Sequence, residues 1–263
     1  MKYIFEYGLW ETDFFLNDIL PEGEIKQIKM EVIKNTQETC DVFAFACRPH
    51  NFDDIEKIIQ RIKPKIIIMT SDEFHQEDNS IYNQLGNECE LFLRQYHHSN
   101  YTYTSNTLHI PLGYTNGCKS FNESKKLKWS WFGEIKNDRV EMLNQFRKLN
   151  PYLIGTSLSK ELMCKGYSQS IFVPCGRGNS SLDCFRLYEA SVNGAVPVVV
   201  GSKEEIEVTF KYEENPPWIF AETWNDAVNE CQIILEDGIK SESVIKWWNQ
   251  RVLKIKNKVK EVL

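Results

Sequence analysis

The stretch that decides the fold is residues 170–201, SIFVPCGRGNSSLDCFRLYEASVNGAVPVVVG. Its apolar run Ile171–Pro174 predicts a buried strand, and Ala195–Val200 predicts a second one. Between them, Leu182–Val192 has the pattern of a helix, which Gly194 ends. A strand, a glycine-containing loop, a helix and a second strand form one βαβ unit. The stretch therefore predicts a parallel sheet covered by helices.

The loop of this unit has the features of a phosphate site. A helix N-terminus offers unpaired N–H groups and a partial positive charge. Arg177 lies in the loop between Gly176 and Gly178, and Arg186 lies in the first turns of the helix. Their guanidinium groups match phosphate oxygens, and Glu189, on the same helix face as Arg186, can accept hydrogen bonds from ribose hydroxyls. The pattern predicts a nucleotide site; the alternative is an exposed Arg–Glu pair with no function.

Three segments of this stretch resemble the donor-binding segment of exostosin-like glycosyltransferases: Gly176–Gly178, Phe185–Ala190 and Gly194–Val198. The resemblance is looser elsewhere. It implies an α/β protein with two Rossmann-like lobes of the GT-B type and a cleft between them. We expect residues 1–120 to form the acceptor-side lobe and residues 121–263 to form the nucleotide-sugar lobe.

Apolar runs and amphipathic stretches alternate along the rest of the chain, as this architecture requires. Strands are expected at 3–7, 41–47, 65–69, 89–93, 107–110, 128–132, 152–155 and 218–220. Helices are expected at 53–62, 139–149, 224–235 and 243–262, and an extended piece at 26–34. The polar run 116–128 is expected to link the lobes.

Composition narrows the function. The chain has 263 residues, 26% of them charged, and a formal net charge of -6, which disfavours a general nucleic-acid binder. Its eight cysteines form no Cys-x-x-Cys pair, which disfavours zinc and thioredoxin-type sites. There is no Asp-x-Asp motif that would hold a divalent cation at a strand end. We therefore expect no metal and no cofactor, with a nucleotide sugar as substrate.

The first residues of the chain do not read as a targeting segment, because Glu6 and Glu11 interrupt the apolar positions. No apolar run approaches the length of a membrane-spanning helix. We expect a soluble, cytoplasmic protein without stable membrane insertion, unlike the membrane-anchored animal and plant members of the family. It would be a microbial or viral member, or a chain from which the anchor has been removed.

The resemblance assigns further donor-site residues. Gly133 follows the first strand of the second lobe, and in the family a basic residue at the position of Arg139 approaches the donor diphosphate. A surface arginine at a helix start is the alternative for Arg139. The expected donor site comprises Gly133, Arg139, Arg177, Gly178, Asn179, Ser180, Ser181, Arg186 and Glu189, and either serine could cap the helix.

Strand ends in the first lobe offer candidates for the other half of the site. Asp72 and Glu73 follow one predicted strand and are our candidates for the catalytic base; a solvated turn is the alternative. The first-lobe pattern Ser71–Glu73, Arg94–Tyr96 and Pro111–Tyr114 resembles the soluble, ribitol-xylosyltransferase-like branch of the family. The expected acceptor-site residues are Trp10, Asp13, Arg94 and His97, and His75, His97 and His98 are further candidates for proton transfer. The alternatives are a place in the first-lobe core for Trp10 and Asp13 and a surface loop for the adjacent His97 and His98.

These features predict a metal-independent, inverting glycosyltransferase that moves a sugar from a UDP donor, with UDP-xylose as one candidate, to a hydroxyl of a glycan or glycoprotein. Two alternatives stay open. Gly176-x-Gly178 begins a dinucleotide fingerprint, with Glu204 after the next strand, although Ser181 replaces the third glycine. That pattern would suit an NAD-dependent oxidoreductase or epimerase. The other alternative is a non-catalytic protein that binds nucleotide sugars.

Overall fold

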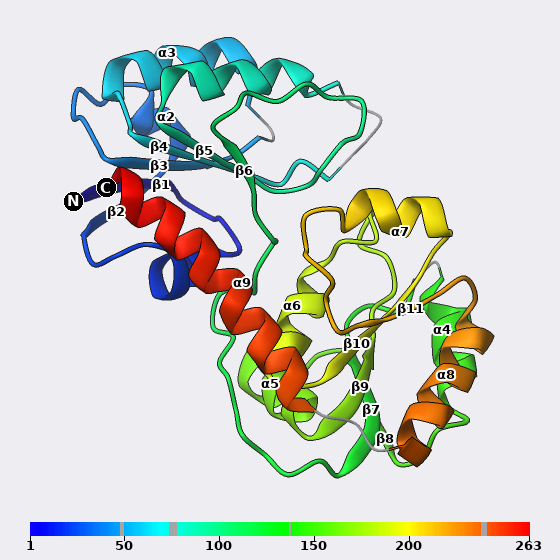
Figure 1. Ribbon diagram of the computed structural model, residues 1–263. Coiled ribbons are helices and arrows are strands. Elements are labelled where there is room, and N and C mark those ends of the chain that lie inside the picture. The colour runs from blue at the N-terminus through cyan, green and yellow to red at the C-terminus, as the bar shows by residue number, and fades with distance from the viewer. Residues whose placement is uncertain (48–49, 74–77, 137, 238–240) are drawn as a thin grey trace. The chain divides into compact units, whose positions relative to one another are not determined.

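The computed structural model describes residues 1–47, 50–73, 78–136, 138–237 and 241–263. These residues form two compact units, Met1–Leu112 together with Val252–Leu263, and Gly113–Arg251. Each unit has one parallel sheet with helices packed on it (Figure 1), so the predicted α/β fold with two lobes is confirmed. We expected the lobes to be residues 1–120 and 121–263. In the structure the first unit consists of Met1–Leu112 and, in addition, the C-terminal segment Val252–Leu263.

The first unit is a six-stranded sheet with the order β2-β1-β3-β4-β5-β6. Its strands are β1 (Lys2–Glu6), β2 (Glu24–Ile28), β3 (Val42–Ala46), β4 (Ile66–Thr70), β5 (Leu91–Arg94) and β6 (Thr107–His109). Its short helices are α1 (Thr12–Phe14), the π-helical η1 (Phe15–Ile19), α2 (Met30–Ile33) and the 3₁₀-helical η2 (Ser80–Glu88). The longest helix that lies wholly in this unit is α3 (Phe52–Ile62).

Helix α3 forms as its sequence predicts. Asn51 caps it by accepting a hydrogen bond from the backbone N–H of Asp54 at 2.9 Å, and Lys63 ends it in the left-handed conformation. Four isoleucines recur at helical spacing, and all of them are buried against the strands and η2: Ile55, Ile58, Ile59 and Ile62. This apolar face packs against the sheet whose strand ends carry the predicted site residues Asp72, Glu73 and Arg94.

The second unit is a five-stranded sheet with the order β11-β10-β9-β7-β8. Its strands are β7 (Leu127–Phe132), β8 (Tyr152–Gly155), β9 (Ser170–Pro174), β10 (Val196–Val200) and β11 (Ile219–Ala221). Its helices are α4 (Arg139–Phe146), α5 (Lys160–Ser168), α6 (Phe185–Val192), α7 (Lys203–Thr209) and α8 (Trp224–Asp237). Helix α9 (Ser241–Val262) begins in this unit.

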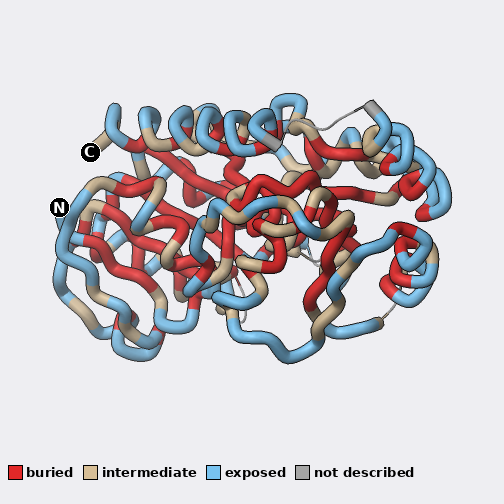
Figure 2. The backbone as a smooth tube through the Cα atoms, turned by 90° about the horizontal axis from the view of Figure 1, so that it is seen from below, coloured by how far each residue is buried: buried red, intermediate tan, exposed pale blue. Residues whose placement is uncertain are grey.

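Helices cover both faces of the second sheet. Helix α4 packs with α8 through Phe146, whose ring contacts Trp129 of β7 and Trp224 of α8, whereas α5 and α6 pack together against β9 and β7. Figure 2 shows the result, with the strands largely buried and the outer faces of the helices exposed. A parallel sheet buried on both faces leaves only its edges and its strand ends to bind ligands.

In both units the strand order reverses beside the first strand. The chain runs from β1 to the edge strand β2 and returns on the other side of β1 to form β3; the second unit does the same with β7, β8 and β9. Such a topological switch point leaves a crevice at the carboxyl ends of the two inner strands, where ligands bind in open parallel sheets. The candidate ligand sites are therefore the ends of β1 and β3 in the first unit and the ends of β7 and β9 in the second.

The observed elements depart from the expected ones in a few places. The expected extended piece at 26–34 divides into β2 and the short helix α2. Helix α6 begins at Phe185 rather than Leu182, because the Ser181 hydroxyl accepts a hydrogen bond from the Asp183 N–H at 3.0 Å and keeps those residues in a turn. Elements that we did not predict are α1, η1, α5, α7 and η2. No helix in the described part of the chain combines the length and apolarity needed to span a membrane.

Candidate functional site

Arg186 lies at the switch point of the second unit. It belongs to the first turn of α6, and its guanidinium reaches the end of β7, where Nε and Nη2 donate to the Phe132 carbonyl at 3.3 and 3.2 Å. The guanidinium also lies 5.4 Å from the centre of the Trp131 ring. Among the described residues, no carboxylate lies within ion-pair distance of Arg186. Because arginine is always protonated in proteins, this partly buried charge has no protein counter-ion there.

Gly133 makes room for that guanidinium. Its φ is 146°, a backbone conformation that L side chains rarely adopt, and a Cβ atom would lie 3.0 Å from Arg186 Nη2. A side chain at position 133, which we predicted as part of the donor site, would therefore be strained and would crowd Arg186.

Arg139 brings a second positive charge to the same place. Its side chain is buried, Nη1 donates to the Glu134 carbonyl at 2.9 Å, Nη2 donates to the Arg177 carbonyl at 2.5 Å, and Nε has no partner in the described structure. Burial, and then the charge of Arg186, lower the pKa of Arg139 below its ordinary value. A buried and a partly buried cation that repel each other favour an anionic ligand. We call Gly133, Arg139 and Arg186 the anion site.

Arg177, by contrast, already has an anionic partner. Both of its terminal nitrogens form an ion pair with the Glu205 carboxylate, with 2.6 Å between Nη2 and Oε2. The hydrogen bond to Glu205 raises the pKa of Arg177 above its ordinary value. Glu205 lies at the start of α7, and nothing in the spacing of the loop predicts it. The donor-binding role of Arg177 stays a prediction, and its charge is neutralised in this structure.

Glu189 lies one turn after Arg186 on α6, as the spacing predicts, and is 4% exposed. Its Oε1 accepts hydrogen bonds from the Thr115 hydroxyl at 2.5 Å and from Lys160 Nζ at 3.1 Å. We predicted neither partner, because Thr115 follows the first unit and Lys160 opens the unexpected helix α5. Glu189 therefore belongs to a small polar cluster beside the anion site, which we call the Glu189 cluster.

The remaining loop residues shape the backbone between β9 and α6. The Gly178 N–H donates to the Ser181 carbonyl at 2.9 Å and closes the loop. Ser181 is buried, Ser180 is partly buried and Asn179 is exposed. Gly176 is needed for a separate reason, since a Cβ there would lie 2.8 Å from Arg139 Cγ. Donor contacts from Gly178, Asn179, Ser180 and Ser181 stay predictions.

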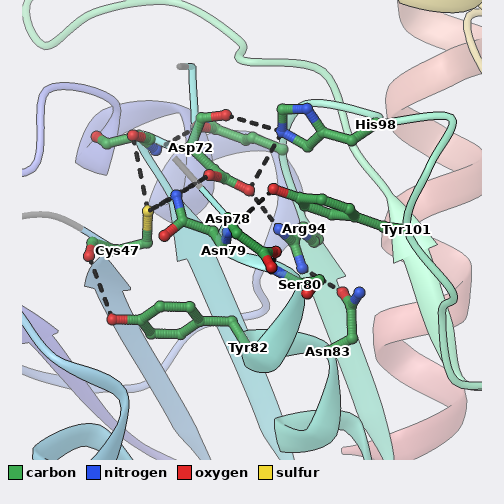
Figure 3. Close-up of polar contacts among 12 residues, drawn as sticks. Cys47, Asp72, Asp78, Asn79, Ser80, Tyr82, Asn83, Arg94, His98 and Tyr101 are labelled. Atoms are coloured by element: carbon green, nitrogen blue, oxygen red, sulfur yellow. Dashed lines mark hydrogen bonds and ion pairs between the residues drawn. The ribbon is translucent and has the colours of Figure 1, made fainter. Parts of the chain in front are cut away.

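In the first unit, Asp72 is the centre of a buried network at the end of β4 (Figure 3). Arg94 Nη2 forms a close ion pair with Asp72 Oδ2, Asn79 Nδ2 donates to Oδ1 at 2.6 Å, and His98 Nε2 lies 3.3 Å from Oδ2. Burial opposes ionisation, but the hydrogen bond from His98 and the charge of Arg94 together lower the pKa of Asp72. A low pKa makes a carboxylate a weak base, so this geometry favours a positioning role for Asp72.

The other predicted first-lobe residues are distributed around that network. Arg94 is fully buried, and its Nη1 also bonds to Asn83. His97 is partly buried, with its ring edge-to-face against His109 at 5.1 Å. Trp10 is 69% exposed, and Asp13 and Glu73 are partly buried. The base role of Asp72 and Glu73 and the acceptor role of Trp10, Asp13, Arg94 and His97 stay predictions, and His75 lies outside the described residues.

Glu11 is a site candidate that we did not predict. It is 2% exposed in the loop after β1, and its Oε1 has no hydrogen-bond partner in the described structure. Burial raises the pKa of Glu11 to about 7, against the opposing hydrogen bonds of the Gln95 and Thr70 side chains. The only signal in the sequence is its place directly after a predicted strand, between the aromatic Trp10 and Asp13.

No three His, Cys, Asp or Glu side chains among the described residues are grouped so that they could hold a metal ion. All eight cysteines are free thiols; seven are buried and Cys89 is partly buried.

Comparisons with known proteins bear on the fold. No family model matches the chain, and no curated protein matches it in sequence. Among solved structures, the chain is similar to HepE from Anabaena in complex with UDP, with UDP-glucose, and with UDP and glucose. The TM-scores are 0.58, 0.57 and 0.56 at 9%, 10% and 12% identity, and each match covers 99% of this chain and 98% of HepE. At such low identity the similarity shows a shared fold over the whole chain.

Proposed function

We propose that this protein transfers a sugar from a nucleotide donor, with UDP as the nucleotide, to a hydroxyl group of a glycan. The observation on which the proposal rests is the anion site, where Arg139 and Arg186, neither of which forms an ion pair with a described carboxylate, bring two positive charges to the switch point of the second sheet. Two cations at a helix N-terminus suit a diphosphate. The fold shared with HepE, which has been crystallised with UDP and UDP-glucose, supports this choice of ligand.

The chemistry follows from where the charge develops. When the bond between the sugar and the diphosphate breaks, negative charge builds on the leaving phosphate. Arg186 and Arg139 are held in place by the Phe132, Glu134 and Arg177 carbonyls, so they stabilise that charge without reorganising. In this proposal the arginines do the work that a divalent cation does in metal-dependent sugar transfer.

Ribose recognition is assigned to the Glu189 cluster. Glu189 is one helical turn from Arg186, about the separation between a ribose and its diphosphate, and carboxylates accept hydrogen bonds from vicinal hydroxyls. Lys160 and Thr115 hold one carboxylate oxygen in place. The resemblance to exostosin-like enzymes favours an inverting reaction and makes UDP-xylose one candidate donor.

Calorimetric titration with UDP, GDP and NAD tests the proposal. We expect UDP to bind at a single site per chain with a measurable heat of binding. We also expect the protein to release UDP from at least one of a panel of UDP-sugars. Thermal stabilisation by NAD without stabilisation by UDP would favour the oxidoreductase alternative. UDP binding without turnover of any donor would favour the non-catalytic alternative.

A further inference from the structure

Two cysteines of the second unit bring their sulfur atoms into direct contact. Cys118 lies in the turn that follows Thr115, and Cys164 lies in the middle of α5. Their Sγ atoms are 3.2 Å apart. Cys164 is fully buried, whereas Cys118 is 8% exposed between the exposed residues Gly117 and Lys119. None of the roles described above includes either cysteine.

The separation of the two sulfur atoms is close to the length of a disulfide bond. Sulfur atoms in a disulfide are about 2.05 Å apart, so the 3.2 Å between Cys118 and Cys164 has to shorten by about 1.2 Å. Each sulfur then moves by about 0.6 Å, which is within the ordinary thermal displacement of atoms in a folded protein. The bond can therefore form while the turn and α5 stay folded.

The two thiols also share their protons. The hydrogen bond between them lowers the pKa of Cys164 below its ordinary value and raises the pKa of Cys118. The ammonium group of Lys160, one helical turn before Cys164, also favours the thiolate. Burial instead raises the pKa of Cys40 and the pKa of Cys89 to about 12. The contacting pair therefore loses its first proton more readily than those cysteines, and the thiolate is the form that reacts with oxidants.

The two cysteines lie on the segments that hold the Glu189 cluster. The Cys118 N–H donates to the Thr115 carbonyl at 3.1 Å, so the two residues belong to one turn. Lys160 precedes Cys164 by one turn of α5. Thr115 and Lys160 are the residues that donate hydrogen bonds to Glu189 Oε1. A covalent bond between the cysteines would therefore fix both donors relative to each other.

We propose that Cys118 and Cys164 are a redox modification site, at which a hydroperoxide closes a reversible disulfide that fixes the Glu189 cluster. The Cys118 sulfur, the more exposed of the two, attacks one oxygen of hydrogen peroxide. The O–O bond breaks, the leaving hydroxide takes the thiol proton to form water, and Cys118 becomes a sulfenic acid. The Cys164 sulfur then attacks the Cys118 sulfur, and the S–O bond breaks with release of a second water. Two thiols are oxidised, one peroxide is reduced, and a dithiol reductant reverses the reaction.

Peptide mapping by mass spectrometry tests the site directly. The folded, reduced protein is treated with hydrogen peroxide, its remaining thiols are alkylated, and it is digested without reductant. We expect a cross-linked peptide that joins Cys118 to Cys164 and that dithiothreitol separates. The variants Cys118→Ser and Cys164→Ser should each lack it. Cys40→Ser is the matched control, because Cys40 is 7% exposed, about as buried as Cys118, and lies in the first unit. It should form the same cross-link as the wild type.

Two further measurements test what the disulfide does. It joins residues 46 positions apart, so we expect oxidation to raise the midpoint of thermal unfolding by about 5–10 °C in the wild type and not in Cys118→Ser. Hydrogen exchange should become slower in the peptides that contain Thr115 and Lys160. Unchanged exchange in these peptides after complete cross-linking would overturn the claim that the disulfide fixes the Glu189 cluster.

Three results would overturn the modification site itself. The first is a folded wild type that forms no cross-link under peroxide conditions that oxidise free glutathione. The second is a cross-link that forms only in denaturant, because it would belong to the unfolded chain. The third is a cross-link between Cys175 and Cys184 in place of the proposed one, since the hydrogen bond from Cys175 lowers the pKa of Cys184 to about 7. None of these measurements uses UDP, so they are independent of the proposed function.

Discussion

The two units present arginines at their strand ends in opposite electrostatic states. In the first unit Arg94 is fully buried and its charge is matched by Asp72. In the second unit Arg186 and Arg139 are held by carbonyl oxygens, and the described residues supply no carboxylate that pairs with either. The same residue type in the same fold therefore has two uses. A neutralised arginine holds strand ends together, whereas Arg139 and Arg186 are held by carbonyl oxygens and form no ion pair with a described carboxylate.

The difference has an energetic meaning. Burying an unpaired charge lowers the stability of the fold by several kcal/mol. A protein therefore tolerates unpaired cations away from water chiefly where a bound anion neutralises them. Removing a partner from the Arg94 pair should therefore damage folding, and removing Arg186 should damage ligand binding. The variants below separate these two effects.

The largest expected effect comes from breaking the neutralised pair. Arg94→Met leaves Asp72 buried without its cation, and we expect a loss of about 3–5 kcal/mol in the free energy of unfolding at pH 7. Because the pKa of Asp72 is lowered in the folded state, this stabilisation exists at neutral pH and is lost as the pH falls through that pKa. Chemical denaturation at pH 7 and at lower pH measures both.

Glu38→Gln is the control for this variant, since its exposed ion pair with Lys26 should contribute nothing measurable. Equal stability of Arg94→Met and the wild type would contradict the neutralised state of the pair.

The next effect concerns Glu11. Its raised pKa means that an ionised, buried carboxylate weakens the fold at pH 8, and the wild type should gain stability as the pH falls through about 7 towards 4.5. A shift from 4.5 to about 7 corresponds to about 3 kcal/mol. We therefore expect Glu11→Gln to be more stable than the wild type at pH 8, by up to that amount, and to lose this advantage at pH 4.5.

Thermal unfolding across pH 4.5–8 gives the comparison, with Glu22→Gln, an exposed carboxylate in the same unit, as the charge-matched control. A constant difference between Glu11→Gln and the wild type over this range would show that Glu11 does not titrate near pH 7.

The smallest effect tests the space around Arg186. Gly133→Ala combines a positive φ with a Cβ 3.0 Å from Arg186 Nη2, so we expect a loss of about 1 kcal/mol in stability and weaker UDP binding. Gly8→Ala is the matched control, because Gly8 has a φ of 99° and open space where the Cβ would be. It should lose similar stability and keep its UDP affinity. Equal UDP affinity in the wild type, Gly133→Ala and Gly8→Ala would contradict the claim that position 133 crowds the Arg186 guanidinium.

Much of the fold could be predicted from the sequence. Apart from β2, whose residues are largely exposed, the strands of both sheets and the long helices α3, α8 and α9 follow from apolar runs and helical spacing, because burial on both faces of a parallel sheet leaves a strong signal. Helices α5 and α7 were missed, since their apolar faces are short and interrupted by charged residues. The start of α6 was misplaced by a side-chain hydrogen bond of Ser181, which spacing does not reveal.

The site was predictable only where its parts are close in sequence. The spacing of Arg186 and Glu189 on one helix predicted their common face, and Gly133 followed from its place after a strand. The partners Glu205, Lys160 and Thr115 come from other elements, so no local pattern indicates that they neutralise Arg177 or hold Glu189. For the same reason the contact between Cys118 and Cys164, which joins a turn to α5, could not be predicted.

The most direct test of the central claim is a calorimetric titration of UDP into wild type, Arg186→Ala and Arg177→Ala. Removing a guanidinium that forms no ion pair with a described carboxylate should weaken UDP binding by on the order of 100-fold, whereas Arg177, already paired with Glu205, should matter far less. Equal losses in the two variants, or none in Arg186→Ala, would contradict the account.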